Sequence, residues 1–392
     1  HAMAMIGLER GAEDPFNGHV VTDGSGAPTG MLYEEAVGYA VKRLPRLTRA
    51  QDILGVRQGQ ALANRHGITG IVDPSVTGRE AAAYATLAEE GALTLRVGGA
   101  ARVAAGDSTA ATCDRLEALR RSHSGPDFRI HSAKFFLDGI FENRTAALLE
   151  PYADEKGGNA APLFSDEQVR ALFCALDAAR FQIHCHVIGD LAARQALDGF
   201  AAAAAVNGRW PSLHQLAHLQ LIRPADMVRM AALGVMGNIQ PLWARHDPAA
   251  ADPAHAMIGP ARLGQTYAFR QMANAGVQLC LSSDWSVSTL NPFAIIETAL
   301  TRQAPLAEGA LEPFLPAEAL TIREAVLGYT LNAAAAAWRS DETGRLSPGF
   351  SADMIILDRD IFRCAPHEIG GTEVLWTLFK GREVYRAAGF DG

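Results

Sequence analysis

The stretch FQIHCHVIGD (residues 181–190) carries two histidines, two residues apart, at the end of an apolar run. In a β-strand, side chains at positions i and i+2 point to the same face about 6.6 Å apart. His184 and His186 therefore share a face, and Cys185 points to the other one. This spacing fits a pair of metal ligands, and it equally fits a strand that carries one ligand above a hydrogen-bonded histidine. The surrounding sequence has to decide between the two.

Short β-rich runs alternate with alanine-rich helical stretches, which is the pattern of repeated βα units around a parallel sheet. The seven expected strands are residues 67–75, 94–103, 129–139, 181–190, 212–220, 234–241 and 276–285. The expected helices between them include residues 79–91, 165–180, 191–205 and 224–234. Because a closed (β/α)8 TIM barrel has eight strands, we predict an α/β protein of this fold whose strand one is missing.

The pattern changes after Asn332. Residues 344–360 and 373–386 alternate apolar and polar side chains around Gly and Pro turns, which predicts a small antiparallel β unit. Residues 18–36 read as a hairpin that leads into a helix. We therefore expect two domains. An N-terminally incomplete hydrolase barrel would span 1–335, and the C-terminal part of a small composite β-sandwich would span 336–392.

Composition excludes several classes of protein. With 392 residues, 48% hydrophobic and 20% charged, the chain can bury a large core. A net charge of -8 and a pI near 5.9 argue against nucleic acid or an anionic membrane surface as partner. We find no apolar run of about 18 residues, so a cytoplasmic location is expected. The five cysteines are odd in number, widely spaced and without a CxxC pair, which predicts reduced thiols.

Four polar residues stand at the ends of expected strands, where barrel enzymes place their reacting groups. They are Lys134, His186, His218 and Asp284. In the strand RIHSAKFFL (129–137), the alternation turns Phe135 toward the helices and Lys134 toward the interior. Burying an ammonium group costs several kcal/mol unless it is paired, deprotonated or modified.

Each of these residues also has a plain structural interpretation. Lys134 could form an interior ion pair, His218 could be a hydrogen-bonded core histidine, and Asp284 could cap a helix. The occurrence of all four at strand ends favours a shared site.

These segments resemble the metal-dependent amidohydrolase superfamily, specifically its amidohydrolase-3 branch, which includes N-substituted formamide deformylases. The resemblance runs from about Gly18 to Arg386. It rests on KFFLDGIFENRTAALLEPYAD (134–154), HVIGD (186–190), LAHLQLIRPADMVRMAALGVMGNIQP (216–241), SSDWSVSTLNPF (282–293), TIREAVLGYTLNAAAA (321–336) and GRLSPGFSADMIILD (344–358).

The resemblance implies a set of metal ligands. They are Lys134, as a carbamate that bridges two metals where the site is binuclear, together with His186, His218 and Asp284. It implies one or two divalent ions, and these donors suit Zn²⁺ best, with Mn²⁺, Fe²⁺ or Co²⁺ also compatible. The family's HxH pair precedes the lysine, so the resemblance makes His186 the ligand and His184 a supporting residue. The true HxH strand is absent here, and we expect the sequence to be a fragment.

This chain departs from the family pattern at Phe141 and Glu142, where the family has small residues, and at Phe350, where a lysine is common. The first departure bears on the shape of the substrate pocket.

The function that follows is hydrolysis of a non-peptide C–N bond, in an amide or formamide of a small molecule, by metal-activated water. Asp284 would act as the catalytic proton shuttle. The residues expected to contact substrate are Arg144, Thr145, Trp243 and Trp285, with Arg245 beside them; surface placement of the arginine and ordinary packing of the tryptophans are the alternatives.

Two rival functions remain in view. One is a catalytically silent binding or assembly subunit of the same fold that lacks the strand-one HxH. The other is a phosphate-binding barrel enzyme, which needs a glycine-rich loop that residues 282–292 do not offer. The expected partner is a small amide-type molecule, and a homodimer is compatible with the sequence.

Overall fold

The computed structural model describes residues 2–15, 18–249, 251–306 and 311–391. Contacts within the chain divide it into two compact units, His1–Asp52 and Ile53–Gly392.

The first unit holds an antiparallel hairpin that leads into a helix, as the sequence predicts. Strands β1 (Gly18–Thr22) and β2 (Pro28–Glu34) pair and run directly into helix α2 (Glu35–Val41), and the short helix α1 (Ala2–Met5) precedes them. The small core of this unit consists of Ile6, Leu8, Val20, Ala36 and Ala40.

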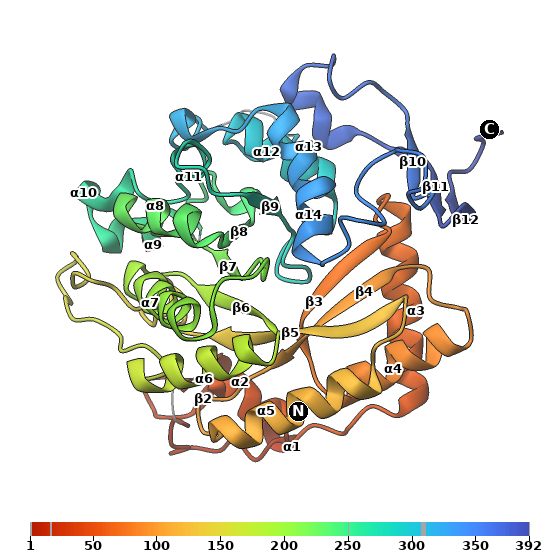
Figure 1. Ribbon diagram of the computed structural model, residues 1–392. Helices are drawn as coiled ribbons and strands as arrows, with labels where there is room; N and C mark the ends of the chain where they lie inside the picture. The colour runs from red at the N-terminus through yellow and green to blue at the C-terminus, as the bar shows by residue number, and fades with distance from the viewer. Residues whose placement is uncertain (1, 16–17, 250, 307–310, 392) are drawn as a thin grey trace. The chain divides into compact units, whose positions relative to one another are not determined.

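The second unit is built on a curved parallel sheet of seven strands that follow one another in chain order (Figure 1). They are β3 (Gly70–Val76), β4 (Arg96–Arg102), β5 (Phe128–Phe136), β6 (Gln182–Val187), β7 (Gln215–His218), β8 (Met236–Ile239) and β9 (Leu279–Leu281). All seven strands expected from the sequence are confirmed. The sheet is a curled half-barrel. That strand one of a (β/α)8 barrel is missing from this sequence stays a prediction.

Helices precede, connect and follow these strands (Figure 1). They are α3 (Arg49–Arg65), α4 (Gly78–Glu89), α5 (Thr109–Ser122), α6 (Asp166–Ala178), α7 (Asp190–Asn207), α8 (Pro224–Leu233), α9 (Ala251–Ile258), α10 (Pro260–Leu263), α11 (Phe269–Asn274), α12 (Pro292–Thr301), α13 (Ile322–Tyr329) and α14 (Leu331–Ala336). In the described part of the chain, 3-10 turns lie at Pro241–Trp243, Pro316–Glu318 and Pro366–Gly371. Ser165 caps α6 in a capping box with Gln168, as its position before an apolar run predicts.

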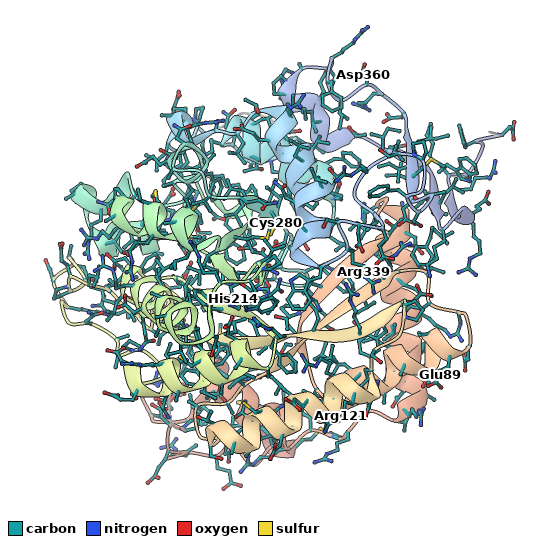
Figure 2. All side chains as sticks on the ribbon, in the orientation of Figure 1. Glu89, Arg121, His214, Cys280, Arg339 and Asp360 are labelled. Carbon is teal, nitrogen blue, oxygen red and sulfur yellow. The ribbon has the colours of Figure 1, made fainter. Side chains whose placement is uncertain are left out.

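The packing of β5 fixes which side chains face the interior. The Phe135 ring meets the Phe173 ring of α6 edge to face, with centroids 5.0 Å apart. Because alternate residues of a strand point to opposite faces, Lys134 points to the concave side. Figure 2 shows the contrast between core and periphery: His214 and Cys280 are buried, whereas Arg121 is an exposed side chain of α5.

A small antiparallel sheet follows the last helices, as expected from the alternating pattern. Strands β10 (Met354–Leu357), β11 (Val374–Phe379) and β12 (Arg382–Arg386) pair in that order. Thr377 Oγ1 donates to the Asn64 carbonyl of α3 at 2.8 Å, and Arg96 of β4 pairs with Asp353 just before β10. The sheet is thus fastened to the half-barrel. The domain boundary at 335 and a complete sandwich stay predictions.

Two further expectations concern thiols and membranes. All five cysteines are free thiols. Among the described residues, none of the helices combines the length and the apolar character that crossing a membrane would require.

Candidate functional site

Three of the predicted site residues lie on consecutive strands near their carboxyl ends. In the register of β5 and β6, Lys134 is opposite His184 and Phe136 is opposite His186. In the register of β6 and β7, Val187 is opposite His218. The side chains of Lys134, His186 and His218 are all buried. The parallel register therefore brings one lysine and two histidines together.

His186 and His218 are in direct contact. The rings of His186 and His218 have centroids 4.5 Å apart and are nearly perpendicular. Burial lowers the pKa of His186 to about 3 and lowers the pKa of His218 well below its usual value. Both imidazoles are therefore neutral at physiological pH, which is the form that binds metals.

Hydrogen bonds select one ring nitrogen of each histidine. The Gly139 carbonyl accepts from His186 Nε2 at 3.0 Å, and Asp138 Oδ1 lies 3.8 Å from the same nitrogen. Gln240 Oε1 accepts from His218 Nδ1 at 2.8 Å. In a neutral imidazole the other nitrogen then carries a lone pair. The nitrogens left to bind a metal are Nδ1 of His186 and Nε2 of His218, each with the opposite nitrogen anchored in the way that metal-ligating histidines are.

Lys134 lies within this cluster, and its ammonium nitrogen is 4.9 Å from the centre of the Phe136 ring. Burial lowers the pKa of Lys134 to about 8, against the electrostatic attraction of Asp284. His184 lies one pleat below His186, and burial lowers its pKa well below the usual value. Its Nδ1 is buried with no hydrogen-bond partner among the described residues.

Asp284 follows β9 and is near enough to Lys134 to interact electrostatically. Burial raises the pKa of its carboxyl group. The alternative that Asp284 caps a helix is wrong, because the next helix, α12, begins at Pro292 and is capped by the Asn291 side chain.

Across the described ranges, no three histidine, cysteine, aspartate or glutamate side chains form a group that could hold a metal ion. The structure gathers Lys134, His186 and His218, and Asp284 interacts electrostatically with the lysine. The ligand role of each residue stays a prediction.

The backbone is strained at two of these four residues. His218 has φ +77° and Asp284 has φ +51°, both in the left-handed region that favours glycine. Such conformations cost about 1–3 kcal/mol each and cluster at functional sites. Leu219, at φ +49°, continues the turn that ends β7 at His218. His218 thus combines a strained backbone with a place in the histidine cluster.

The residues predicted to contact substrate lie in different surroundings. The Trp243 ring stacks on His218, with centroids 5.2 Å apart and planes within 10°. Trp285 is half exposed. Arg144 pairs with Asp154 at 2.5 Å, and its guanidinium lies over the Tyr152 ring.

Thr145 Oγ1 accepts a hydrogen bond from the backbone N–H of Ile140 at 2.9 Å and so closes the loop after β5. Trp243 is thus in contact with the histidine cluster, while Arg144 and Thr145 make contacts within their own loop.

Sequence reasoning missed two side chains that hold the histidines. Asp138 is fully buried and accepts hydrogen bonds from the backbone of Ala147, Ile188 and Gly189, and Gln240 anchors His218. The only signal for each was a polar residue directly after an apolar strand.

Comparison with known proteins identifies the family. A model of the amidohydrolase family, for its amidohydrolase-3 branch, matches residues 1–385. YtcJ of Bacillus subtilis is 25% identical over 394 residues, covering 98% of this chain and 71% of that protein. The N-substituted formamide deformylase of Arthrobacter pascens is 26% identical over 412 residues, covering 99% and 71%.

Among solved structures, an uncharacterized metal-dependent hydrolase from Pyrococcus horikoshii superimposes with a TM-score of 0.74 at 22% identity, covering 94% of this chain and 69% of that one. That likeness supports the fold. The family model matches nearly the whole chain, and this chain therefore belongs to the amidohydrolase family.

Proposed function

We propose that this protein is a metal-dependent hydrolase that cleaves a non-peptide C–N bond, in an amide or formamide of a small molecule. The observation that carries the proposal is the pair of buried, neutral imidazoles of His186 and His218. In each ring one nitrogen, Nε2 of His186 and Nδ1 of His218, is already hydrogen-bonded to an acceptor. Ligand histidines need this arrangement, since the second nitrogen fixes the tautomer and the ring plane.

The donor set fits a divalent cation. His186 Nδ1 and His218 Nε2 would hold it, and Zn²⁺ is the ion that such ligands suit best. When bound, the ion lowers the pKa of a water molecule toward neutrality and polarises a substrate carbonyl. A second ion would require a bridging ligand, and Lys134 is the candidate.

Lys134 has a chemical reason to be modified. It is buried, and Asp284 is the carboxylate that acts on it electrostatically. The lysine ammonium first loses one proton. The neutral amine then adds to CO₂, forming an N–C bond and releasing a second proton, so that a cation becomes a carbamate anion. That anion would remove the buried positive charge of Lys134 and supply the oxygen ligands that a second divalent ion needs.

Asp284 would move the proton. Its carboxyl group lies at the end of β9 beside Lys134, and burial raises its pKa, which makes it a better base than an exposed aspartate. It would take a proton from the attacking water and deliver it to the departing nitrogen.

The walls of the site suggest the kind of substrate. Trp243 on His218 and the half-exposed Trp285 beside Asp284 offer flat apolar surfaces, which suit an aromatic or aliphatic group on the amide nitrogen. The relative from Arthrobacter pascens is named for N-substituted formamides. Arg144 would reach substrate only by leaving its ion pair with Asp154. Thr145 would contact the carbonyl group of the substrate.

A silent binding or assembly subunit is the second candidate. The histidine pair argues against it, because a scaffold that performs no chemistry has no need for two buried imidazoles that are each anchored through one nitrogen as metal ligands are.

The experiment is Asp284→Asn in the full-length protein, with bound metal and kcat measured on formamide and amide substrates. The exposed aspartate Asp198→Asn is the matched control. General acid–base catalysis contributes about 10²–10⁴-fold, so kcat should fall by that factor while metal content is mostly retained. A variant that keeps its metal and turns over within about threefold of wild type would show that Asp284 is not the base.

A further inference from the structure

A chain of hydrogen-bonded polar side chains crosses the concave face of the sheet from helix α14 to His218. Its members are Gln182 on β6, Gln215 on β7, Asn238 on β8, Gln240 just after β8, and Ser282 just after β9. The four amides are nearly fully buried. Because a buried amide without partners is costly, each amide is expected to adopt the one orientation that satisfies all its neighbours.

The chain starts at backbone carbonyls, which can only accept hydrogen bonds. Gln182 Nε2 donates to the carbonyls of Leu213 and Ala336, both at 2.9 Å. The Ala336 carbonyl lies in the last turn of α14, where carbonyls have no partner within the helix. The amide nitrogen of Gln182 must face these two acceptors, so its oxygen faces Gln215.

The orientation then passes from strand to strand. Gln215 Nε2 donates to Gln182 Oε1 at 2.9 Å and to the Ala336 carbonyl at 3.0 Å, which uses both of its hydrogens. Gln215 Oε1 is therefore the atom that accepts from Asn238 Nδ2 at 2.9 Å. This leaves Asn238 Oδ1 to face the next residues of the chain.

At the end of the chain near His218, the hydrogen bonds allow only one orientation of the Gln240 amide. Asn238 Oδ1 accepts from Ser282 Oγ at 2.7 Å and from Gln240 Nε2 at 3.1 Å, and Gln240 Nε2 also donates to Ser282 Oγ at 2.7 Å. Gln240 Oε1 thus points at His218 Nδ1, 2.8 Å away. A carbonyl oxygen cannot donate, so the proton of this hydrogen bond belongs to His218 Nδ1.

We infer that Gln240 is a positioning residue that holds His218 in its Nδ1-protonated tautomer, with a lone pair on Nε2, and that the amide chain ending at Ala336 holds Gln240 in turn. The tautomer follows from the hydrogen bonds alone. Its consequence for metal binding rests on the proposed function, because Nε2 is the nitrogen that would bind the ion.

The tautomer can be read directly from the imidazole ¹⁵N signals of histidine-labelled, metal-free protein, with His218→Asn used to assign the signal. Wild-type protein should show His218 protonated on Nδ1. Gln240→Met keeps the length of the side chain and removes the acceptor. A neutral hydrogen bond stabilises by about 0.5–1.5 kcal/mol, so the tautomer ratio should shift roughly 3- to 10-fold toward Nε2–H.

Two further variants separate positioning from general damage. Gln240→Glu retains an acceptor and should keep the Nδ1–H tautomer. Gln195→Met removes another buried glutamine, on α7, whose Nε2 donates to the Phe164 carbonyl and to Asp166. It should leave the His218 signal unchanged.

The second readout is the affinity of the full-length protein for Zn²⁺ alone. Loss of a residue that orients a ligand typically costs 10–100-fold in metal affinity, so Gln240→Met should fall in that range. Gln240→Glu should stay within about fivefold of wild type, because the acceptor remains.

The possible outcomes are distinct. Wild-type His218 protonated on Nε2, or Gln240→Met with an unchanged tautomer, would overturn the inference. If wild-type protein shows the Nδ1–H tautomer and Gln240→Met loses it, but neither binds Zn²⁺, the inference stands and the proposed function fails. Loss of the tautomer together with weaker Zn²⁺ binding supports both.

Discussion

Replacing Asp138 with asparagine should destabilise the half-barrel severely, although the side chain barely changes in shape. The Asp138 carboxylate lies just after β5 and is fully buried. Oδ1 accepts from the Ile188 amide at 3.0 Å, and Oδ2 accepts from the amides of Gly189 at 2.8 Å and Ala147 at 3.0 Å. The carboxylate thereby connects the end of β5 to the turn that begins α7 and to the loop between β5 and α6.

The magnitude follows from counting donors. Asparagine offers one oxygen, so its best orientation leaves at least one backbone N–H facing an NH₂ group, and an unpaired buried donor costs about 1–3 kcal/mol. The remaining bonds lose their charge, and a hydrogen bond to a charged group contributes about 1 kcal/mol more than a neutral one. We expect Asp138→Asn to lower the free energy of unfolding by about 3–5 kcal/mol.

The assay is urea unfolding followed by far-UV circular dichroism, with Asp198→Asn as the control. Asp198 pairs with Arg229 at the surface, where such pairs contribute about 0–1 kcal/mol. If Asp138→Asn lies within about 0.5 kcal/mol of that control, the role assigned to the buried carboxylate is refuted.

Two pairs of substitutions test the packing and the electrostatics of the same unit. A Cβ added at Gly189 would lie 1.9 Å from the Ala147 carbonyl oxygen, so Gly189→Ala should lower the free energy of unfolding by about 3 kcal/mol or more. Gly55 lies in a helix with open space around it, so Gly55→Ala should raise the free energy of unfolding by about 0.5–1 kcal/mol. Thermal unfolding that shifts both variants in the same direction would contradict this. The Arg270 hydrogen bonds lower the pKa of Glu324 to about 2, from the ordinary value of 4.5. The stabilisation is therefore complete above the unfolded pKa and is lost as pH falls toward 2. Glu324→Gln should therefore lower the free energy of unfolding by about 1–2 kcal/mol at pH 7 after discounting for solvent screening, and this loss should shrink between pH 5 and pH 3. The control is Glu80→Gln, at the matching position of another capping box. A loss that does not depend on pH, or an equal loss in the control, would show that the ion pair is not its source.

The sequence predicts most of the fold because the half-barrel depends on local patterns. Its strands are short apolar runs between turn residues, and helix starts such as Ser165 follow from capping chemistry that lies within four residues. The inward direction of Lys134 was likewise available from alternation along β5.

The supporting residues of the candidate site could not be found in this way. Asp138 binds amides 50 and 51 residues away, and Gln240 owes its orientation to a carbonyl in α14. Such partners become neighbours only when the sheet forms. The strained φ of His218 is also a product of that packing, since nothing in LAHLQ (216–220) signals a left-handed residue.

The most direct test of the metal-site account is anomalous diffraction from crystals of the full-length protein loaded with Zn²⁺. We predict a zinc peak within about 2.0–2.2 Å of both His186 Nδ1 and His218 Nε2. Zinc-saturated crystals with no peak between these two nitrogens, or with the metal held only by other residues, would contradict it.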